Sequence, residues 1–378
     1  MKTILYLSWS EITLNNLKFR NILALEKKKF KILYVDISEI LFKKKFKVKK
    51  KTNVGKLNIL KIDSYQNLKK ILIEKKIDLI LNFTGVQTRG NNLYDLLLDS
   101  KTPIVNILDF TLDKSVFFPY RLLYYLKNIL FSLINLLKKK NLEYFICTGS
   151  HPRNFFNYSN RMIYLHSWEY EFLQREKIKS QKKNKIVSFL DQGWGFHPDM
   201  INENKENKGL KNERFNSRNN LKKINLLFNI FKKKGYKIYF LQHPKTNHIK
   251  HNILKNCKII RNKTAHYVAK SEIILSFGSE STQYAVIMKK KIIFLKNEQL
   301  KSYPLNYEYL NYIEKFFKIK CLNLDDLSED YPNRFRKIRK HILLPSIVYK
   351  KFIDLRCIHP KKLKKNTFKK IFENLANN

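Results

Sequence analysis

The chain has 378 residues, which is long for a single hydrophobic core and suits two domains of similar size. Lys and Arg number 76 against 31 Asp and Glu, and the resulting net charge of +45 favours anionic partners. The four cysteines form no closely spaced pair, which argues against a disulfide framework or a structural zinc site and is typical of the reducing cytoplasm.

The basic residues are spread along the whole chain, and two explanations for them stay open. They could form a surface held against the anionic inner face of a membrane, or they could follow from an AT-rich coding sequence, since Asn and Ile are also abundant. Nucleic acid is not expected as a partner, because the chain has no helix-turn-helix, zinc-knuckle or aromatic RNA-binding signature.

Segments typical of strands and helices alternate from the N-terminus. Residues 1–7 meet polar residues too soon for a signal peptide and predict a first strand. The first half predicts strands at 4–9, 31–37, 78–83, 103–107 and 143–148, and helices at 15–28, 65–76 and 119–140. Uninterrupted β-branched runs between helices are typical of buried parallel strands, so residues 1–173 predict a Rossmann-like domain.

The helix at 119–140 has a wide apolar face, which favours packing on the sheet over an alternative position in a membrane interface. No apolar stretch reaches the roughly 18 residues of a spanning helix. We therefore expect a cytoplasmic protein, either free or peripheral on the inner face of the membrane.

The polar stretch 174–184 predicts a linker, and a second alternating array follows it. Strands are predicted at 186–190, 237–241, 259–260, 273–277 and 292–295, helices at 221–234, 265–270 and 281–288, and a long polar loop at 201–220. Residues 185–345 thus predict a second domain, and 346–378 a basic helical segment. The predicted fold class is α/β, with two facing Rossmann-like domains and a cleft between them.

The first candidate site follows the strand at 186–190. Asp191 would be delivered to the carboxyl edge of the sheet, where it could take a proton from an acceptor hydroxyl, and Gly193 permits a tight backbone path. The alternative is an ordinary turn after a strand. His197 and Asp199 follow closely and are assigned to substrate binding.

The second candidate site follows the strand at 237–241 and comprises Gln242, His243, Pro244 and Lys245. A histidine at a strand end, stiffened by the next proline, can donate to a phosphate or protonate a leaving group, and the lysine adds positive charge. A surface histidine in an ordinary loop is the alternative.

The third candidate site joins the strand at 273–277 to a helix and comprises Gly278, Ser279, Ser281 and Thr282. Hydroxyls, amides and the helix dipole would converge on an anion there, and glycine would permit its close approach. A serine that only caps the helix is the alternative.

Missing motifs narrow the chemistry. The chain has no G-x-G-x-x-G, no G-x-x-x-x-G-K-[ST] and no D-x-D metal clamp. We therefore expect no cofactor and no metal, with the charge of a leaving group met by hydroxyls, histidine and lysine.

Taken in order, the motifs resemble bacterial surface-polysaccharide glycosyltransferases of GT-B architecture, in particular sialyltransferase-like ones. The matching segments are Leu190-Asp191-Gln192 with His197-Pro198-Asp199, then His243-Pro244, then Ser279-Glu280-Ser281-Thr282, and also Leu165-His166-Ser167-Trp168-Glu169-Tyr170. The resemblance implies transfer from a nucleotide-activated sugar, with the aspartate as base, the histidine on the phosphate or leaving group, and the serines on the phosphate. It departs at Gln192, where sialyltransferases often have a second acidic residue, so the identity of the donor stays open.

The resulting hypothesis is a metal-independent inverting glycosyltransferase of capsule, lipopolysaccharide or related surface-glycan synthesis. Residues 185–345 would bind the nucleotide-sugar donor, with a CMP-linked nonulosonic acid among the candidates, and residues 1–173 the glycan or lipid-linked acceptor. Alternatives are a nucleotide-sugar epimerase, a polyol-phosphate transferase, or a non-catalytic basic protein that binds lipopolysaccharide or an anionic membrane.

Overall fold

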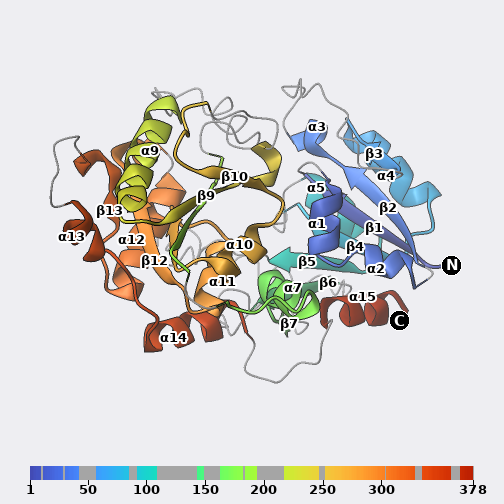
Figure 1. The fold of residues 1–378 in the computed structure, drawn as a ribbon. Helices are drawn as coiled ribbons and strands as arrows, with labels where there is room; N and C mark the ends of the chain where they lie inside the picture. The colour runs from blue at the N-terminus through green and yellow to red at the C-terminus, as the bar shows by residue number, and fades with distance from the viewer. Residues whose placement is uncertain are drawn as a thin grey trace. The chain divides into compact units, whose positions relative to one another are not determined.

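A computed structural model of the chain gives its fold (Figure 1). It describes residues 1–9, 12–28, 30–41, 57–84, 92–108, 143–148, 162–181, 184–193, 217–246, 252–302, 304–327, 334–358 and 367–377. The chain divides into two compact units, one formed by Met1–Phe172 with Asp354–Asn378 and the other by Leu173–Ile353. The predicted helix at 119–140 lies outside the described residues.

The first unit contains a parallel sheet of seven strands in the order β3-β2-β1-β4-β5-β6-β7. The strands are β1 (Thr3–Ser8), β2 (Lys31–Asp36), β3 (Ile59–Lys61), β4 (Leu79–Phe83), β5 (Ile104–Leu108), β6 (Glu143–Thr148) and β7 (Met162–Leu165). All five residues of β4 are buried, as expected for a central strand covered on both faces.

The helices of this unit are short. They are α1 (Leu14–Phe19), α2 (Leu23–Glu26), α3 (Ser38–Leu41), α4 (Tyr65–Glu74), α5 (Asn92–Asp99), α7 (Trp168–Arg175), which begins here, and α15 (Thr367–Asn377). The prediction of one helix over 15–28 is wrong. Asn21 adopts a positive φ of 58°, which ends the first helix and starts a second.

The C-terminal helix α15 packs into the core of the first unit. Phe368 stacks on the buried Trp168 with ring centroids 3.3 Å apart, and Phe372 lies against the same ring. The Phe368 amide donates to Glu171 Oε1 at 3.3 Å, so a carboxylate satisfies a donor in the first turn of the helix.

The second unit contains a parallel sheet of six strands in the order β10-β9-β8-β11-β12-β13. The strands are β8 (Ile186–Leu190), β9 (Lys237–Gln242), β10 (Lys258–Arg261), β11 (Ile273–Ser276), β12 (Lys291–Lys296) and β13 (Leu322–Asn323). The helices are α9 (Ser217–Lys233), α10 (Thr264–Lys270), α11 (Thr282–Ile287), α12 (Pro304–Phe317), α13 (Arg334–Arg339) and α14 (Ile347–Arg356), with 3₁₀ turns η3 (Pro244–Thr246), η4 (Glu298–Ser302) and η5 (Leu324–Asp326). The helix α9 begins at Ser217, so the polar loop predicted at 201–220 ends earlier than expected.

The core of the second unit is aromatic around its central strand. Phe189 of β8 stacks on Phe240 of β9 with ring centroids 5.2 Å apart and meets Phe228 of α9 edge-on. These buried rings hold α9 on the sheet and fix the position of the strand ends. The two parallel sheets with their helices confirm the predicted α/β class with two Rossmann-like domains.

Candidate functional site

The strand order of the second unit reverses between β8 and β11. From β8 the chain proceeds through β9 to β10 on one side, and from β11 to β12 and β13 on the other. Leu190 pairs with Ser276 at the carboxyl ends of the two central strands. In open parallel sheets such a reversal leaves a crevice beyond the strand ends where ligands bind.

The predicted site residues that the structure describes all follow the carboxyl ends of β8, β9 and β11. They are Asp191 and Gly193 after β8, Gln242, His243, Pro244 and Lys245 at the end of β9, and Gly278, Ser279, Ser281 and Thr282 after β11. His197 and Asp199 lie outside the described residues.

Asp191 ties the loop after β8 to the loop after β9. Its Oδ1 accepts from the Gly193 amide at 2.7 Å, and its Oδ2 accepts from the His243 amide at 3.0 Å and the Thr246 hydroxyl at 3.3 Å. One carboxylate therefore fixes the backbone of the first and second candidate sites together. The link between the two loops could not be predicted from the sequence, because His243 and Thr246 are 52 and 55 residues away from Asp191 in the chain.

The carboxyl group of Asp191 titrates abnormally. Burial raises its pKa above the ordinary value, and the hydrogen bonds from His243, Gly193 and Thr246 offset part of that rise by stabilising the charged form. A carboxyl group with a raised pKa is better suited to accept a proton than an ordinary surface aspartate.

Hydrogen bonds within the loop and from β10 hold the His243 loop in place. The Lys245 amide donates to His243 Nδ1 at 3.2 Å, so in the neutral ring the proton resides on Nε2. The buried Gln242 donates from Nε2 to the Thr246 carbonyl at 2.7 Å and accepts from Arg261 Nε at 2.9 Å. These contacts give Gln242 a supporting position, with its amide committed to the η3 turn and to β10.

The loop after β11 is organised by Ser276, the last residue of the strand. Its Oγ accepts from the Gly278 amide at 3.0 Å and the Ser279 amide at 3.2 Å, and lies 2.8 Å from the Thr282 hydroxyl. Ser281 occupies the N-cap position of α11 without a side-chain capping bond. Several amides predicted to face an anion thus bond within the loop, and the Ser279 Oγ also accepts from the Ser281 amide at 3.3 Å. The side chains of Ser279 and Ser281 are both partly exposed.

Gly278 is required by the fold around it. It has a positive φ of 89°, and a Cβ added to it would come within 2.9 Å of two ring carbons of Tyr309 in α12. A glycine is therefore needed for both conformation and space at this position, whatever ligand the loop binds.

Sequence reasoning missed three residues that build the site. Thr246 and Arg261 hold the His243 loop, and Ser276 holds the loop after β11. Only Ser276 carried a usable signal, since a serine two residues before a glycine at a strand end commonly accepts from nearby amides.

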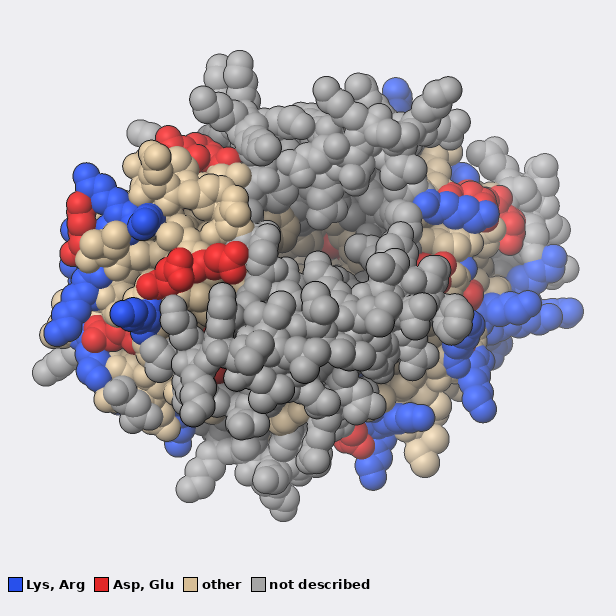
Figure 2. Space-filling model, turned by 180° about the vertical axis from the view of Figure 1, so that it is seen from behind, with Lys and Arg blue, Asp and Glu red and all other residues tan. Residues whose placement is uncertain are grey.

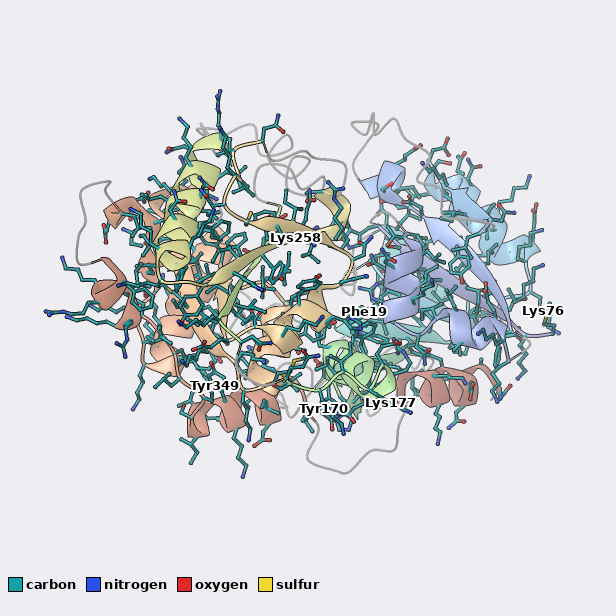
Figure 3. All side chains as sticks on the ribbon, in the orientation of Figure 1. Phe19, Lys76, Tyr170, Lys177, Lys258 and Tyr349 are labelled. Carbon is teal, nitrogen blue, oxygen red and sulfur yellow. The ribbon has the colours of Figure 1, made fainter. Side chains whose placement is uncertain are left out.

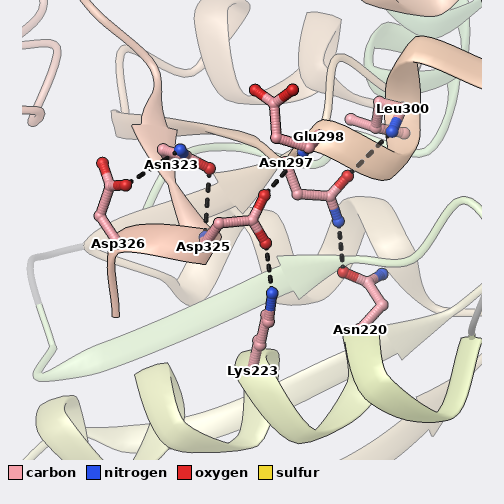
Figure 4. A network of polar contacts seen from close by, with 8 residues as sticks. All are labelled: Asn220, Lys223, Asn297, Glu298, Leu300, Asn323, Asp325 and Asp326. Atoms are coloured by element: carbon pink, nitrogen blue, oxygen red, sulfur yellow. Dashed lines mark hydrogen bonds and ion pairs between the residues drawn. The ribbon is translucent and has the colours of Figure 1, made fainter. Parts of the chain in front are cut away.

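Farther along the same edge, a polar network joins the loops after β12 and β13 to α9 (Figure 4). Asn297, which is buried, donates to Asn220 Oδ1 at 2.8 Å and accepts from the Leu300 amide at 3.1 Å. Asp325 pairs with Lys223 and accepts from the Glu298 amide at 2.7 Å. This network fixes the outer half of the carboxyl edge beside the site.

Within the part of the chain that the structure describes, no group of three or more His, Cys, Asp or Glu side chains is placed to hold a metal ion. Among the helices that the structure describes, none has the length and apolarity needed to cross a bilayer.

No protein-family model matches the chain, and no curated protein matches it by sequence. Among solved structures, its fold is similar to that of a wall teichoic acid polymerase, TagF (H444N variant), with a TM-score of 0.50 and 12% identity over 100% of this chain and 88% of that one. It is also similar to the UDP-GlcNAc 2-epimerase of Methanocaldococcus jannaschii with UDP-GlcNAc and UDP (TM-score 0.49, 15% identity, 100% of both chains) and to MurG of Acinetobacter baumannii (0.47, 10%, 100% of both). At these identities the likeness shows the two-domain Rossmann-like architecture, of the GT-B kind, and nothing finer.

Proposed function

We propose that the protein is a glycosyltransferase that moves a sugar from a nucleotide-activated donor to an acceptor in surface-glycan synthesis. The observation that carries the proposal is the Asp191 carboxylate, which joins the loops after β8 and β9 beside the reversal of strand order. It holds His243 at the carboxyl end of β9, where this architecture binds ligands.

The donor phosphate would lie between the His243 loop and the loop after β11. His243 Nε2 would donate to the phosphate or to the leaving oxygen, and Lys245 would add positive charge. The partly exposed hydroxyls of Ser279 and Ser281 would donate from the other loop. These groups can meet the negative charge of a departing nucleotide without a metal, in keeping with the missing D-x-D motif.

Asp191 is the proposed base. Inversion at the sugar carbon needs a group that removes the proton of the acceptor hydroxyl as the new bond forms, and the raised pKa of Asp191 suits that task. Its Oδ1 accepts from the Gly193 amide, whereas its Oδ2 accepts from two donors, so Oδ1 is the oxygen better placed to take a further proton donor.

Three finer proposals rest on the sequence motifs and on the net charge of +45. They are a CMP-linked nonulosonic acid among the candidate donors, a glycan or lipid-linked acceptor bound by the first unit, and action at the inner face of the membrane. Solved epimerases and a teichoic acid polymerase share the architecture, so the epimerase and polyol-phosphate transferase alternatives are kept. A product assay separates them, because an epimerase does not lengthen an acceptor, and the mass added to the acceptor distinguishes a sugar from a polyol phosphate.

The first test is thermal unfolding with CMP-, UDP-, GDP- and CDP-linked donors, because a ligand that binds the folded state raises the unfolding temperature. We expect one nucleotide class to do so. His243→Ala should then lower the transfer rate about 10²-fold or more and Ser281→Ala should weaken donor binding, while the exposed Lys76→Ala in the first unit changes neither. Unchanged transfer by both site variants would contradict the assignment.

A further inference from the structure

The amino edge of the second-unit sheet is lined with lysine. Lys237, Lys258 and Lys291 are the first residues of β9, β10 and β12, and Lys185 directly precedes β8 (Lys258 is labelled in Figure 3). The C-terminal ends of the antiparallel-running helices lie at the same edge, and α9 ends in Lys232 and Lys233. Basic residues at helix C-termini are favoured by the helix dipole, so charge alone does not require a partner.

The segment between α13 and α14 adds an apolar element to this edge. Leu343 forms an antiparallel bridge with Ile292, the second residue of β12, which places the segment at the amino end of that strand. Leu344 is 58% exposed and Ile347 is 83% exposed. They are two of only five large hydrophobic residues exposed in the described part of the chain. The helix dipole, which accounts for lysines at helix ends, does not account for exposed aliphatic side chains.

Basic residues flank this aliphatic pair on both sides. The exposed ones are Arg336, Lys337, Arg339 and Lys340 in and after α13, and Lys350 and Lys351 in α14. Seen from behind, Lys and Arg side chains crowd the side of the molecule on which α13 and α14 lie (Figure 2).

The helix α14 separates its faces clearly. Tyr349 and Phe352 are buried, and the Tyr349 hydroxyl donates to the Lys290 carbonyl at 2.8 Å. Ile347, Lys350 and Lys351 are exposed on the opposite side. The aliphatic and the basic side chains therefore share one outward face.

Acidic residues offset this charge only in part: Asp354 of α14 is exposed three and four residues after Lys351 and Lys350, one carboxylate against the six basic side chains. Glu272, just before β11, pairs with Lys291 at 2.6 Å, and Glu314 of α12 lies 3.5 Å from Lys296. Both carboxylates are already matched by lysines other than those of the α13–α14 surface.

We propose that this surface, formed by Leu344 and Ile347 with Arg336, Arg339, Lys340 and Lys350, binds an anionic lipid bilayer. The two aliphatic side chains would enter the interface between head groups and acyl chains, and the basic side chains would pair with lipid phosphates. A free phosphate or a nucleic acid would use the basic residues but gain nothing from the aliphatic pair.

The surface lies at the opposite end of the strands from Asp191 and His243. Strands of this length separate the two edges by roughly 15–20 Å. Membrane binding therefore leaves the carboxyl edge open to small ligands, and the inference does not depend on the proposed transfer reaction.

The test is co-sedimentation of the full chain with vesicles of phosphatidylcholine alone or with roughly a third phosphatidylglycerol, at about 0.1 M and about 0.5 M NaCl. We expect binding only to the anionic vesicles, weakened by salt. Leu344→Ser with Ile347→Ser should weaken it at least fivefold, and Arg336→Glu with Lys340→Glu and Lys350→Glu at least tenfold.

A matched control exists in α4 of the first unit, where Ile73 is 72% exposed beside the exposed Lys69, Lys75 and Lys76. Ile73→Ser with the three lysines changed to glutamate makes the same change in charge as the variant of Arg336, Lys340 and Lys350 and also removes an exposed aliphatic side chain, and it should leave binding within twofold. Equal loss in the control would show that net charge alone drives binding and would overturn the proposal. Full binding by the Leu344/Ile347 variant, or stronger binding to a single-stranded RNA than to anionic vesicles, would also overturn it.

Discussion

The two edges of the second-unit sheet are built in opposite ways. At the carboxyl edge, polar side chains accept from loop amides, as Asp191 does from Gly193 and His243 and Ser276 does from Gly278. At the amino edge, the polar residues are mostly exposed lysines, and the aliphatic side chains of Leu344 and Ile347 beside them are also exposed to solvent.

The difference teaches what each edge can recognise. Loops held by internal hydrogen bonds present groups in fixed positions, which suits a small ligand of defined shape. Mobile lysine side chains around exposed aliphatic residues suit a soft and extended anionic surface instead. Four substitutions test how far this contrast holds.

The largest effect on stability is expected from Gly278→Ala at the carboxyl edge. The new methyl group would meet Tyr309 at 2.9 Å in a backbone with φ of 89°, so we expect a loss of about 3 kcal/mol in the free energy of unfolding. Gly235→Ala is the control, because its φ is also positive (78°) and the nearest atom is Lys185 Nζ at 3.9 Å. It should cost only about 1 kcal/mol in urea unfolding, and equal losses would show that Tyr309 does not constrain the loop.

The next effect is expected from Asp191→Asn. Asparagine keeps only one acceptor oxygen, because its amide nitrogen is a donor, so it cannot accept from the His243 and Gly193 amides together. We expect a loss of about 2 kcal/mol and faster hydrogen exchange at the His243 amide. Asp36→Asn is the matched control in the first unit, since Asp36 ends β2 and accepts from the Ser38 amide at 2.9 Å, a bond that asparagine retains. Slow exchange at His243 in the Asp191 variant would refute the role of the carboxylate in fixing that loop.

The strands were largely predictable from the sequence because buried parallel strands are continuous apolar runs. The runs at 186–190 and 273–277 match β8 and β11 within one residue at either end. Short strands such as β3 and β13 were missed, because two or three residues carry no periodicity. The positive φ of Asn21 divides the segment predicted as one helix over 15–28, and the composition of the segment does not reveal this backbone angle.

The location of the candidate site could be predicted from the sequence, but the contacts that hold its residues in place could not. Strand ends could be read from hydrophobic runs, which placed Asp191, His243 and Gly278 at one edge. The partners of Asp191 are 52 and 55 residues away in the chain, at His243 and Thr246, and only the folded sheet brings them together. The space beside Gly278 is likewise filled by a helix that begins 26 residues later.

A smaller effect concerns Lys290, a lysine near the amino edge of the sheet that is only 5% exposed. Its ammonium group donates to the Ala269 carbonyl at 2.6 Å. Burial lowers its pKa to about 8. The folded chain then binds this proton less tightly than the unfolded chain, so the unfolding free energy should rise as pH increases from about 8 towards 10.5. The rise should be about 1–2 kcal/mol and absent in Lys290→Met.

Urea titrations of the wild type and Lys290→Met at several pH values give the difference directly, since other titrating groups are common to both. Lys289→Met is the control, because Lys289 is the exposed neighbour and should leave the pH dependence unchanged. A parallel pH dependence in the wild type and Lys290→Met would show that Lys290 ionises as an ordinary surface lysine. Lys290 would then not differ from the exposed lysines of the amino edge.

The smallest effect is expected from Lys223→Met in the network of Figure 4, where a partly exposed ion pair joins α9 to Asp325. Burial raises the pKa of Asp325, but the Lys223 ammonium and the Glu298 amide outweigh it and hold the pKa below its ordinary value. The stability gained is therefore present at neutral pH and is lost as pH falls below about 4. We expect the variant to be about 0.5–1 kcal/mol less stable at pH 7 and no less stable once Asp325 is protonated, with the exposed Lys222→Met as control. A deficit that persists in acid would mean that Lys223 acts through packing of its alkyl chain, and the carboxyl edge would then be held by its amide bonds without help from this charge pair.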